Sequence, residues 1–146
     1  MLNVSDIVLI VLFLINAVVL RKPFIIITAL LLVTIIDSIL KKCLSPLKSY
    51  RPVHPVNTKD TELGMPSGHA MTAFFLAVTI ICQSDVSTTV KLIVLVMAFS
   101  VSSLRVFEFK HTIPQITVGI LLGFVAGLAL NNVVYSKGSD SSIIKS

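Results

Sequence analysis

Five long apolar blocks separated by polar stretches constrain this chain more than any other feature of its sequence. They cover about residues 4–20, 24–40, 66–83, 88–104 and 114–135. A helix of that length crosses, or nearly crosses, a hydrocarbon core of about 30 Å. Because 55% of the residues are hydrophobic, only 13% are charged and the mean hydropathy is +0.97, a soluble domain with a polar surface is excluded. We therefore predict an all-α fold, an integral membrane helical bundle with about five transmembrane helices.

The spacing of the blocks predicts one domain. Residues 1–135 would form a single transmembrane domain that contains a polar loop at 41–65, and a polar tail would follow at 136–146. The first block has no basic region before it and no small-residue cleavage pattern after it. We therefore expect a retained helix and not a removable signal peptide.

The number of crossings decides which polar segments can meet. With five helices, one membrane face carries the N-terminus, the loop at 41–65, the start of the third helix and the connection between the last two. Asp6 precedes the first helix whereas Arg21 and Lys22 follow it, and these charges have no evident chemical task. The positive-inside rule then predicts that the face with the loop is lumenal or extracytoplasmic.

The formal charge of +5 is spread over the loops, without a polybasic run or an aromatic-rich RNA-binding pattern. A nucleic-acid partner is therefore not expected. The membrane bilayer with its anionic lipid head groups, or a phosphorylated substrate, is the better partner for dispersed basic residues.

Three groups of polar residues converge on the face that carries the loop. They are Arg51-Pro52 in the loop, Pro66-Ser67-Gly68-His69 at a helix start, and Arg105 with His111 around the last connection. A helix N-terminus presents unpaired N–H groups and a partial positive charge, so Ser67 and Gly68 can hold a phosphate oxygen beside His69. Arg51 and Arg105 each offer a planar fork for phosphate. The pattern predicts phosphoryl-transfer chemistry.

Two further patterns are interpreted as features of helix packing and not as parts of a catalytic site. Asp37 precedes Lys41 by four positions, which favours an ion pair over a catalytic role. Gly119, Gly123 and Gly127 repeat a spacing that allows helices to approach closely. Packing within the bundle is favoured for them over contacts in a homo-oligomer.

The polar groups resemble the motifs of the type-2 phosphatidate phosphatase and vanadium haloperoxidase superfamily. The central motif is similar to Pro66-Ser67-Gly68-His69, the third to Arg105 and His111 with five residues between them, and the end of the first to Arg51-Pro52. This resemblance covers about half of the chain, from near Lys41 to Gly119. It implies an acid phosphatase/haloperoxidase-like core, which usually has six crossings, so this chain is expected to lack one N-terminal helix of that fold.

The resemblance also implies a metal-independent mechanism in two steps, without a cofactor. His111 would attack phosphorus to form a phosphohistidine, and His69 would protonate the leaving oxygen before water hydrolyses the intermediate. The phosphate would be held by Arg51, Arg105, a loop lysine, Ser67 and Gly68.

Gln115 departs from the family pattern, which commonly has an aspartate at this place. It follows His111 by four positions on the same helical face, so its neutral amide is expected to orient the imidazole ring by a hydrogen bond. A glutamine here, together with Gly64-Met65-Pro66, is most similar to the dolichyl-diphosphate phosphatase branch.

Leu44 is the second departure, because the first motif has a lysine seven residues before its arginine. We favour Lys42 for the missing phosphate-binding role. Lys41 and Lys48 are the alternatives.

Together these features predict a membrane lipid phosphatase that hydrolyses a polyprenyl diphosphate of the dolichyl type. Phosphatidate or another lipid phosphate is the alternative substrate, because the motifs bind phosphate and do not contact the tail. A non-catalytic membrane scaffold or lipid-binding protein is the alternative from another class, and Gln115 and Leu44 are its main support.

Overall fold

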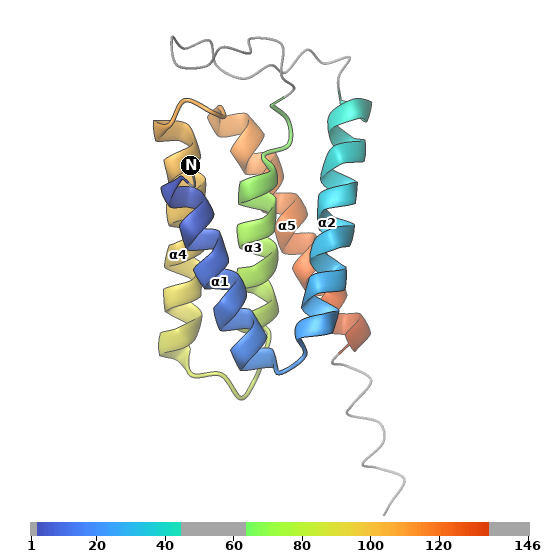
Figure 1. Ribbon diagram of the computed structural model, residues 1–146, viewed down its shortest axis with the longest axis vertical. Coiled ribbons are helices and arrows are strands. Elements are labelled where there is room, and N and C mark those ends of the chain that lie inside the picture. Colours follow the sequence, from blue (N-terminus) through green and yellow to red (C-terminus); the bar gives the residue numbers. More distant parts are fainter. Residues whose placement is uncertain (1–2, 45–63, 135–146) are drawn as a thin grey trace, which may run out of the picture.

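The computed structural model describes residues 3–44 and 64–134, which form a bundle of helices (Figure 1). Its elements are α1 (Val4–Leu20), α2 (Pro23–Cys43), α3 (Gly68–Ile81), α4 (Thr88–Phe107) and α5 (Ile113–Val134). Within these two ranges no residue lies in a strand. The all-α bundle predicted from the apolar blocks is confirmed, and α1 has the expected bounds.

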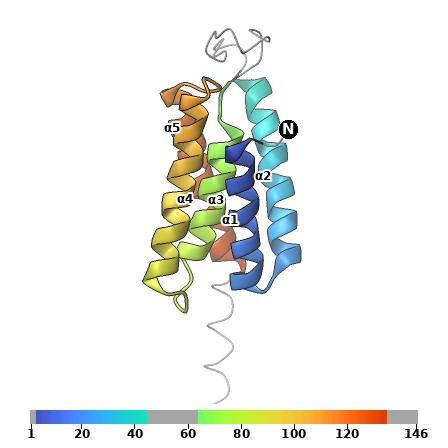
Figure 2. The same ribbon diagram turned by 60° about the vertical axis from the view of Figure 1, so that its left-hand side comes forward.

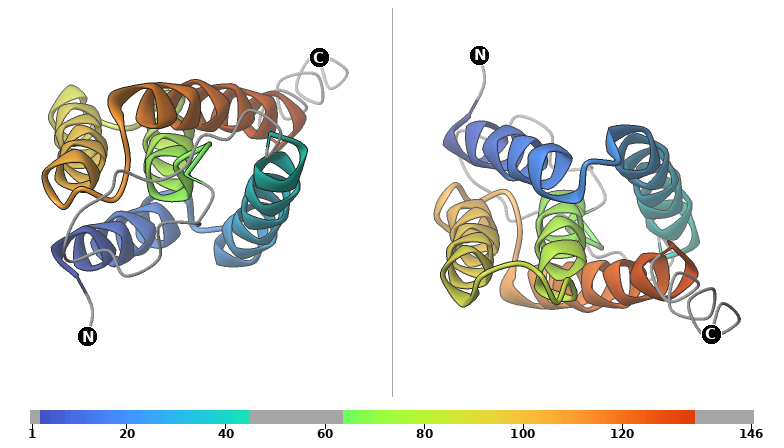
Figure 3. Two further views of the ribbon diagram at one scale, coloured as in Figure 1. Left: turned by 90° about the horizontal axis from the view of Figure 1, so that it is seen from above. Right: turned by 90° about the horizontal axis from the view of Figure 1, so that it is seen from below.

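α3 is the central helix of the bundle. The two end-on views show it surrounded by the other four helices (Figure 3), and ten of its 14 residues are buried. A helix that is apolar all round is typical of such a position, because it packs on every side. The outer helices expose large apolar side chains, among them Leu31, Val96 and Leu121, as expected of a surface that faces lipid.

α5 packs closely against α3 through three glycines. A Cβ on Gly119 would lie 2.6 Å from the carbonyl oxygen of Ser67. A Cβ on Gly123 would collide with the carbonyl oxygen of Met71, and Gly127 is crowded by α3 in the same way. The missing side chains let the two backbones approach. These glycines thus serve packing within the bundle, the use favoured from the sequence.

Three helices, α2, α4 and α5, are long and apolar enough to cross a membrane. α1 and α3 are apolar but shorter, with 17 and 14 residues, so they span about 26 and 21 Å. The chain is a membrane protein built around a short central helix.

The shortness of α3 creates room at one end of the bundle. The sequence predicted this helix over residues 66–83, and it begins only at Gly68, because Ser67 is its extended N-cap. Its start is recessed below the adjacent ends of α2, α4 and α5, which all lie at the same end (Figure 1). The convergence of these helix ends, expected from five crossings, is therefore present.

Candidate active site

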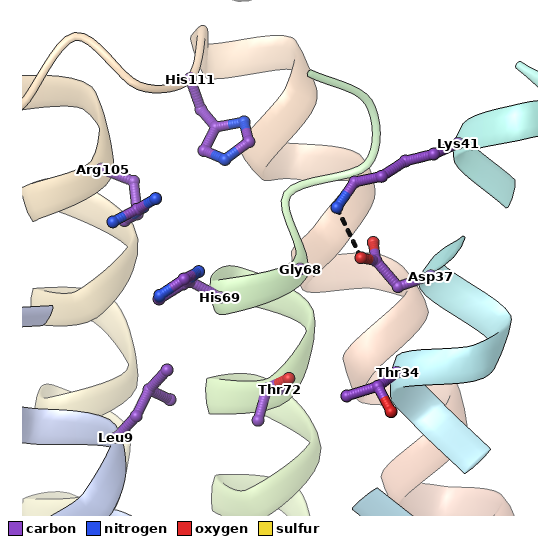
Figure 4. A pocket seen from close by; sticks show the side chains of 9 residues that line it. All are labelled: Leu9, Thr34, Asp37, Lys41, Gly68, His69, Thr72, Arg105 and His111. Atoms are coloured by element: carbon purple, nitrogen blue, oxygen red, sulfur yellow. Dashed lines mark hydrogen bonds and ion pairs between the residues drawn. The ribbon is translucent and has the colours of Figure 1, made fainter. Parts of the chain in front are cut away.

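A cavity of about 300 Å³ lies at the recessed start of α3. Its walls come from α1 to α4 and the α4–α5 connection, and it is lined by Leu9, Thr34, Asp37, Lys41, Gly68, His69, Thr72, Arg105 and His111 (Figure 4). Asp37 and Lys41 face His69 and Arg105 across the space, and His111 stands above them. Both histidines and one arginine of the predicted site therefore meet in one cavity.

His69 is held by an aspartate from α1. Its Nε2 lies 2.7 Å from Asp6 Oδ1, and both side chains remain partly exposed. A carboxylate only accepts hydrogen bonds, so Nε2 carries a hydrogen. Within the described residues Nδ1 of His69 has no hydrogen-bond partner, which makes it the nitrogen that can exchange a proton with a bound molecule. Sequence reasoning missed Asp6 because it lies 63 positions away in another helix.

His111 is buried and is oriented by the backbone. Its Nδ1 lies 2.9 Å from the carbonyl oxygen of Gly64, which can only accept, so Nδ1 carries the hydrogen. In the neutral ring the lone pair is then on Nε2. The sequence did not predict this backbone partner, and the orienting hydrogen bond expected from Gln115 stays a prediction.

Gln115 also contacts the segment from Gly64 to Ser67. It is buried in the first turn of α5, where its Oε1 accepts a hydrogen bond from the Thr112 N–H at 3.0 Å. Its backbone carbonyl oxygen accepts one from the Ser67 N–H at 3.1 Å. A Cβ on Gly64 would lie 2.6 Å from Oε1 and 2.7 Å from Cδ of Gln115. Gln115 therefore packs directly on the residue that orients His111.

The turn after α4 brings His111 next to Arg105. The backbone N–H groups of Lys110 and His111 both donate to the carbonyl oxygen of Arg105, at 3.1 Å each. Phe109 allows this tight turn by adopting a left-handed conformation, with φ of 53°. The five residues between Arg105 and His111 thus form one turn, which these hydrogen bonds close.

The Arg105 guanidinium is buried and anchored. Its Nη1 donates to Glu108 Oε2 at 3.1 Å and to Ser5 Oγ at 3.2 Å. Glu108 is three positions on in the same chain segment, whereas Ser5 comes from α1 and is fully buried. A fixed guanidinium at the cavity wall can bind a phosphate with little loss of side-chain entropy.

Lys41 lines the cavity, whereas Lys42 is exposed and lies outside it. The Nζ of Lys41 is 2.6 Å from Asp37 Oδ2, so the ion pair expected from the sequence is present. Lys42 was the lysine favoured for phosphate binding. α2 continues beyond Leu40 to Cys43, so Lys41 is on the face of Asp37 and Lys42 is turned about 100° away.

At the start of α3, Gly68 lines the cavity, whereas the predicted phosphate ligand Ser67 does not. Ser67 is fully buried, and its Oγ has no partner within residues 3–44 and 64–134. Gly68 lines the cavity and allows α2 to approach, because a Cβ there would lie 2.8 Å from Asp37 Oδ2. An unpartnered hydroxyl beside a helix N-terminus is suited to an anion.

Arg51, which the sequence places with the phosphate ligands, lies outside the described residues, as does Lys48. Among residues 3–44 and 64–134, no three His, Cys, Asp or Glu side chains form a group that could hold a metal ion. The described cavity thus offers two imidazoles, one guanidinium and one ammonium group to an anionic molecule.

Comparison with known proteins gives one match. The family model described as PAP2 superfamily matches residues 22–139, which is most of the chain. Neither the curated proteins nor the solved structures that were compared gave a match. The matched range contains α2 to α5 and excludes α1.

Proposed function

The chain belongs to the PAP2 superfamily, whose members are phosphatases, and from this membership we propose that it hydrolyses a polyprenyl diphosphate of the dolichyl type. The hydrogen bond between His111 Nδ1 and Gly64 carries the proposal. It leaves Nε2 of the neutral ring with a lone pair, in a cavity that also contains His69 and Arg105.

In the first step His111 Nε2 attacks the terminal phosphorus. The new N–P bond forms as the bond from phosphorus to the bridging oxygen breaks, and Nδ1 keeps its hydrogen bond to Gly64. His69 gives its Nδ1 proton to the leaving lipid monophosphate. Arg105 and Lys41 neutralise the charge that develops on the non-bridging oxygens.

In the second step water replaces His111 on phosphorus. A water proton passes to His69 as the O–P bond forms and the N–P bond breaks, which releases inorganic phosphate and regenerates both histidines. No metal ion takes part in either step, and Arg51 joins Arg105 in holding the phosphate.

Two features support a polyprenyl diphosphate as the substrate. Gly64, the first residue of the Gly64-Met65-Pro66 run that resembles the dolichyl-diphosphate branch, binds His111 and packs against Gln115. The cavity also lies at one end of an apolar bundle, so a lipid can keep its tail in the bilayer and present its head group to Lys41 and Arg105.

The cavity end is proposed to be lumenal or extracytoplasmic. The contact with His69 gives Asp6 a chemical task, so its charge no longer bears on orientation. Arg21 and Lys22 remain as the basic pair at the opposite end, and the positive-inside rule assigns that end to the cytoplasm.

The test is phosphate release by the purified protein in detergent, with a chelator present, from a polyprenyl diphosphate, phosphatidate and a soluble phosphate ester. We expect the diphosphate to be the best substrate and His111→Ala to lower the rate at least about 10³-fold. Asp85→Asn, exposed at the opposite end, is the control and should keep the wild-type rate. Faster hydrolysis of phosphatidate would replace the proposed substrate, whereas unchanged release by His111→Ala would exclude the phosphohistidine mechanism.

A further inference from the structure

Two neighbouring residues in the first turn of α1 each contact one residue of the active site. Asp6 binds His69 at 2.7 Å and Ser5 binds Arg105 at 3.2 Å. α1 packs against both α3 and α4, so its first turn reaches the cavity end (Figure 2). The match to the PAP2 superfamily begins only at residue 22, so these contacts come from a helix outside the matched range.

Both oxygens of the Asp6 carboxylate are used. Oδ2 accepts a hydrogen bond from the backbone N–H of Asn3 at 3.0 Å, and Oδ1 is the atom that contacts His69. The bond to Asn3 prevents the carboxylate from rotating freely, and it ties the start of α1 to the same group. A fixed carboxylate on one ring nitrogen sets the imidazole tautomer and stabilises the protonated ring.

Resting on the function proposed above, we propose that Asp6 is a positioning residue for proton transfer by His69. Asp6 keeps the hydrogen on Nε2 and remains ionised throughout. When the P–O bond breaks, the leaving oxygen takes the proton from Nδ1 of the His69 imidazolium, and the ring becomes neutral. When water attacks the phosphohistidine, Nδ1 takes a proton back and the imidazolium is restored beside Asp6.

A capping role is the other function of Asp6 that the contacts allow. It is the third residue of α1, and an acidic residue there stabilises a helix start through the Asn3 N–H. Loss of a cap lowers stability and slows every substrate to the same degree. Loss of a proton-transfer partner instead slows most the substrates whose leaving oxygen needs a proton.

The experiment compares two soluble phosphate monoesters with the purified protein in detergent. The p-nitrophenolate group leaves readily without a proton, whereas an alkoxide leaves only when it is protonated. We expect Asp6→Asn to lower the ratio of kcat/KM for an alkyl phosphate to that for p-nitrophenyl phosphate about tenfold. This is part of the roughly 10²–10⁴-fold contribution of a positioned acid. Ser5→Ala, which acts through Arg105, should lower both rates equally and serves as the matched control.

A second measurement places Asp6→Asn in a His69→Ala background. The proposal predicts no further loss for the alkyl phosphate, because Asp6 then has no ring to position. An equal loss in both backgrounds, or an unchanged ratio of the two substrates, would assign Asp6 to capping alone and overturn the proposal. Phosphate release that His111→Ala and His69→Ala leave unaltered would instead overturn the proposed function itself.

Discussion

Replacing Gly64 by alanine tests whether a backbone carbonyl orients the nucleophile. The new Cβ would collide with Nε2 of Gln115 and lie 2.6 Å from its Oε1, whereas ordinary contacts begin at 3.4 Å, so one of the two residues must move by at least about 0.8 Å. Gln115 is buried and bound to the Thr112 N–H, which limits its retreat. The displacement therefore passes to the Gly64 carbonyl and the His111 ring that it holds.

We expect Gly64→Ala to lower kcat about 10²-fold, because a nucleophile misplaced by about 1 Å loses roughly that factor. KM should change little, since Lys41 and Arg105 are not displaced. Phosphate release under saturating substrate measures kcat. The thermal midpoint in detergent, which should fall with an overpacking cost of about 1–3 kcal/mol, reports stability separately.

A double variant separates orientation from general damage. Adding Gln115→Ala removes the carboxamide that the new Cβ meets, so Gly64→Ala/Gln115→Ala should recover to the kcat of Gln115→Ala alone. Gly127→Ala in α5 is the control, because its Cβ would meet Val78 of α3 at 2.8 Å, far from the cavity. It should lower stability and spare kcat. Wild-type kcat in folded Gly64→Ala, or additive losses in the double variant, would refute the reasoning.

Two more substitutions test the cavity wall and the helix packing. Lys41→Ala should raise KM about tenfold, because that is the loss expected for a charged hydrogen bond to phosphate. Lys42→Ala should change KM less than about twofold. Equal effects of the two substitutions in steady-state kinetics would contradict the assignment of Lys41 to the site. Gly123→Ala should lower the free energy of unfolding by about 1–3 kcal/mol, measured by denaturation in detergent, because its Cβ meets the Met71 backbone.

The helices and their common end were predictable from local sequence. Each apolar block has one length and one pair of polar flanks, so Val4–Leu20 was predicted to the residue, and the bounds of the other helices differ by up to three residues. Once the helix count is known, simple alternation brings the starts of α3 and α5 and the end of α4 together. The meeting of His69, Arg105 and His111 therefore needed no tertiary information.

The contacts that orient these residues were not predictable, because they depend on how helices are rotated and how far they extend. Asp6 reaches His69 only because α1 packs across α3 and α4. The choice between Lys41 and Lys42 depended on the extra turn of α2, which local apolarity did not predict because that turn is polar. Gly64 binds His111 through its backbone carbonyl oxygen. Every residue type has this acceptor, so the sequence does not indicate which residue will use it.

The two cysteines provide a test of sidedness without new labelling sites. Cys43 is exposed at the cavity end of α2, and Cys82 caps α3 at the opposite end. If the cavity is extracytoplasmic, a membrane-impermeant maleimide added to intact cells should label Cys43 in a Cys82→Ser variant. It should label Cys82 in a Cys43→Ser variant only after permeabilisation.

The two cysteines are expected to react with the maleimide at different rates. Burial raises the pKa of the Cys82 thiol, so less of the reactive thiolate is present near neutral pH and Cys82 reacts slowly even when the reagent reaches it. Permeabilised cells at raised pH therefore give the full labelling of Cys82, against which intact cells are compared. Labelling of Cys82 but not of Cys43 in intact cells would reverse the proposed orientation. The roles proposed for His111, His69 and Asp6 would be unaffected, because none of them depends on which compartment the cavity faces.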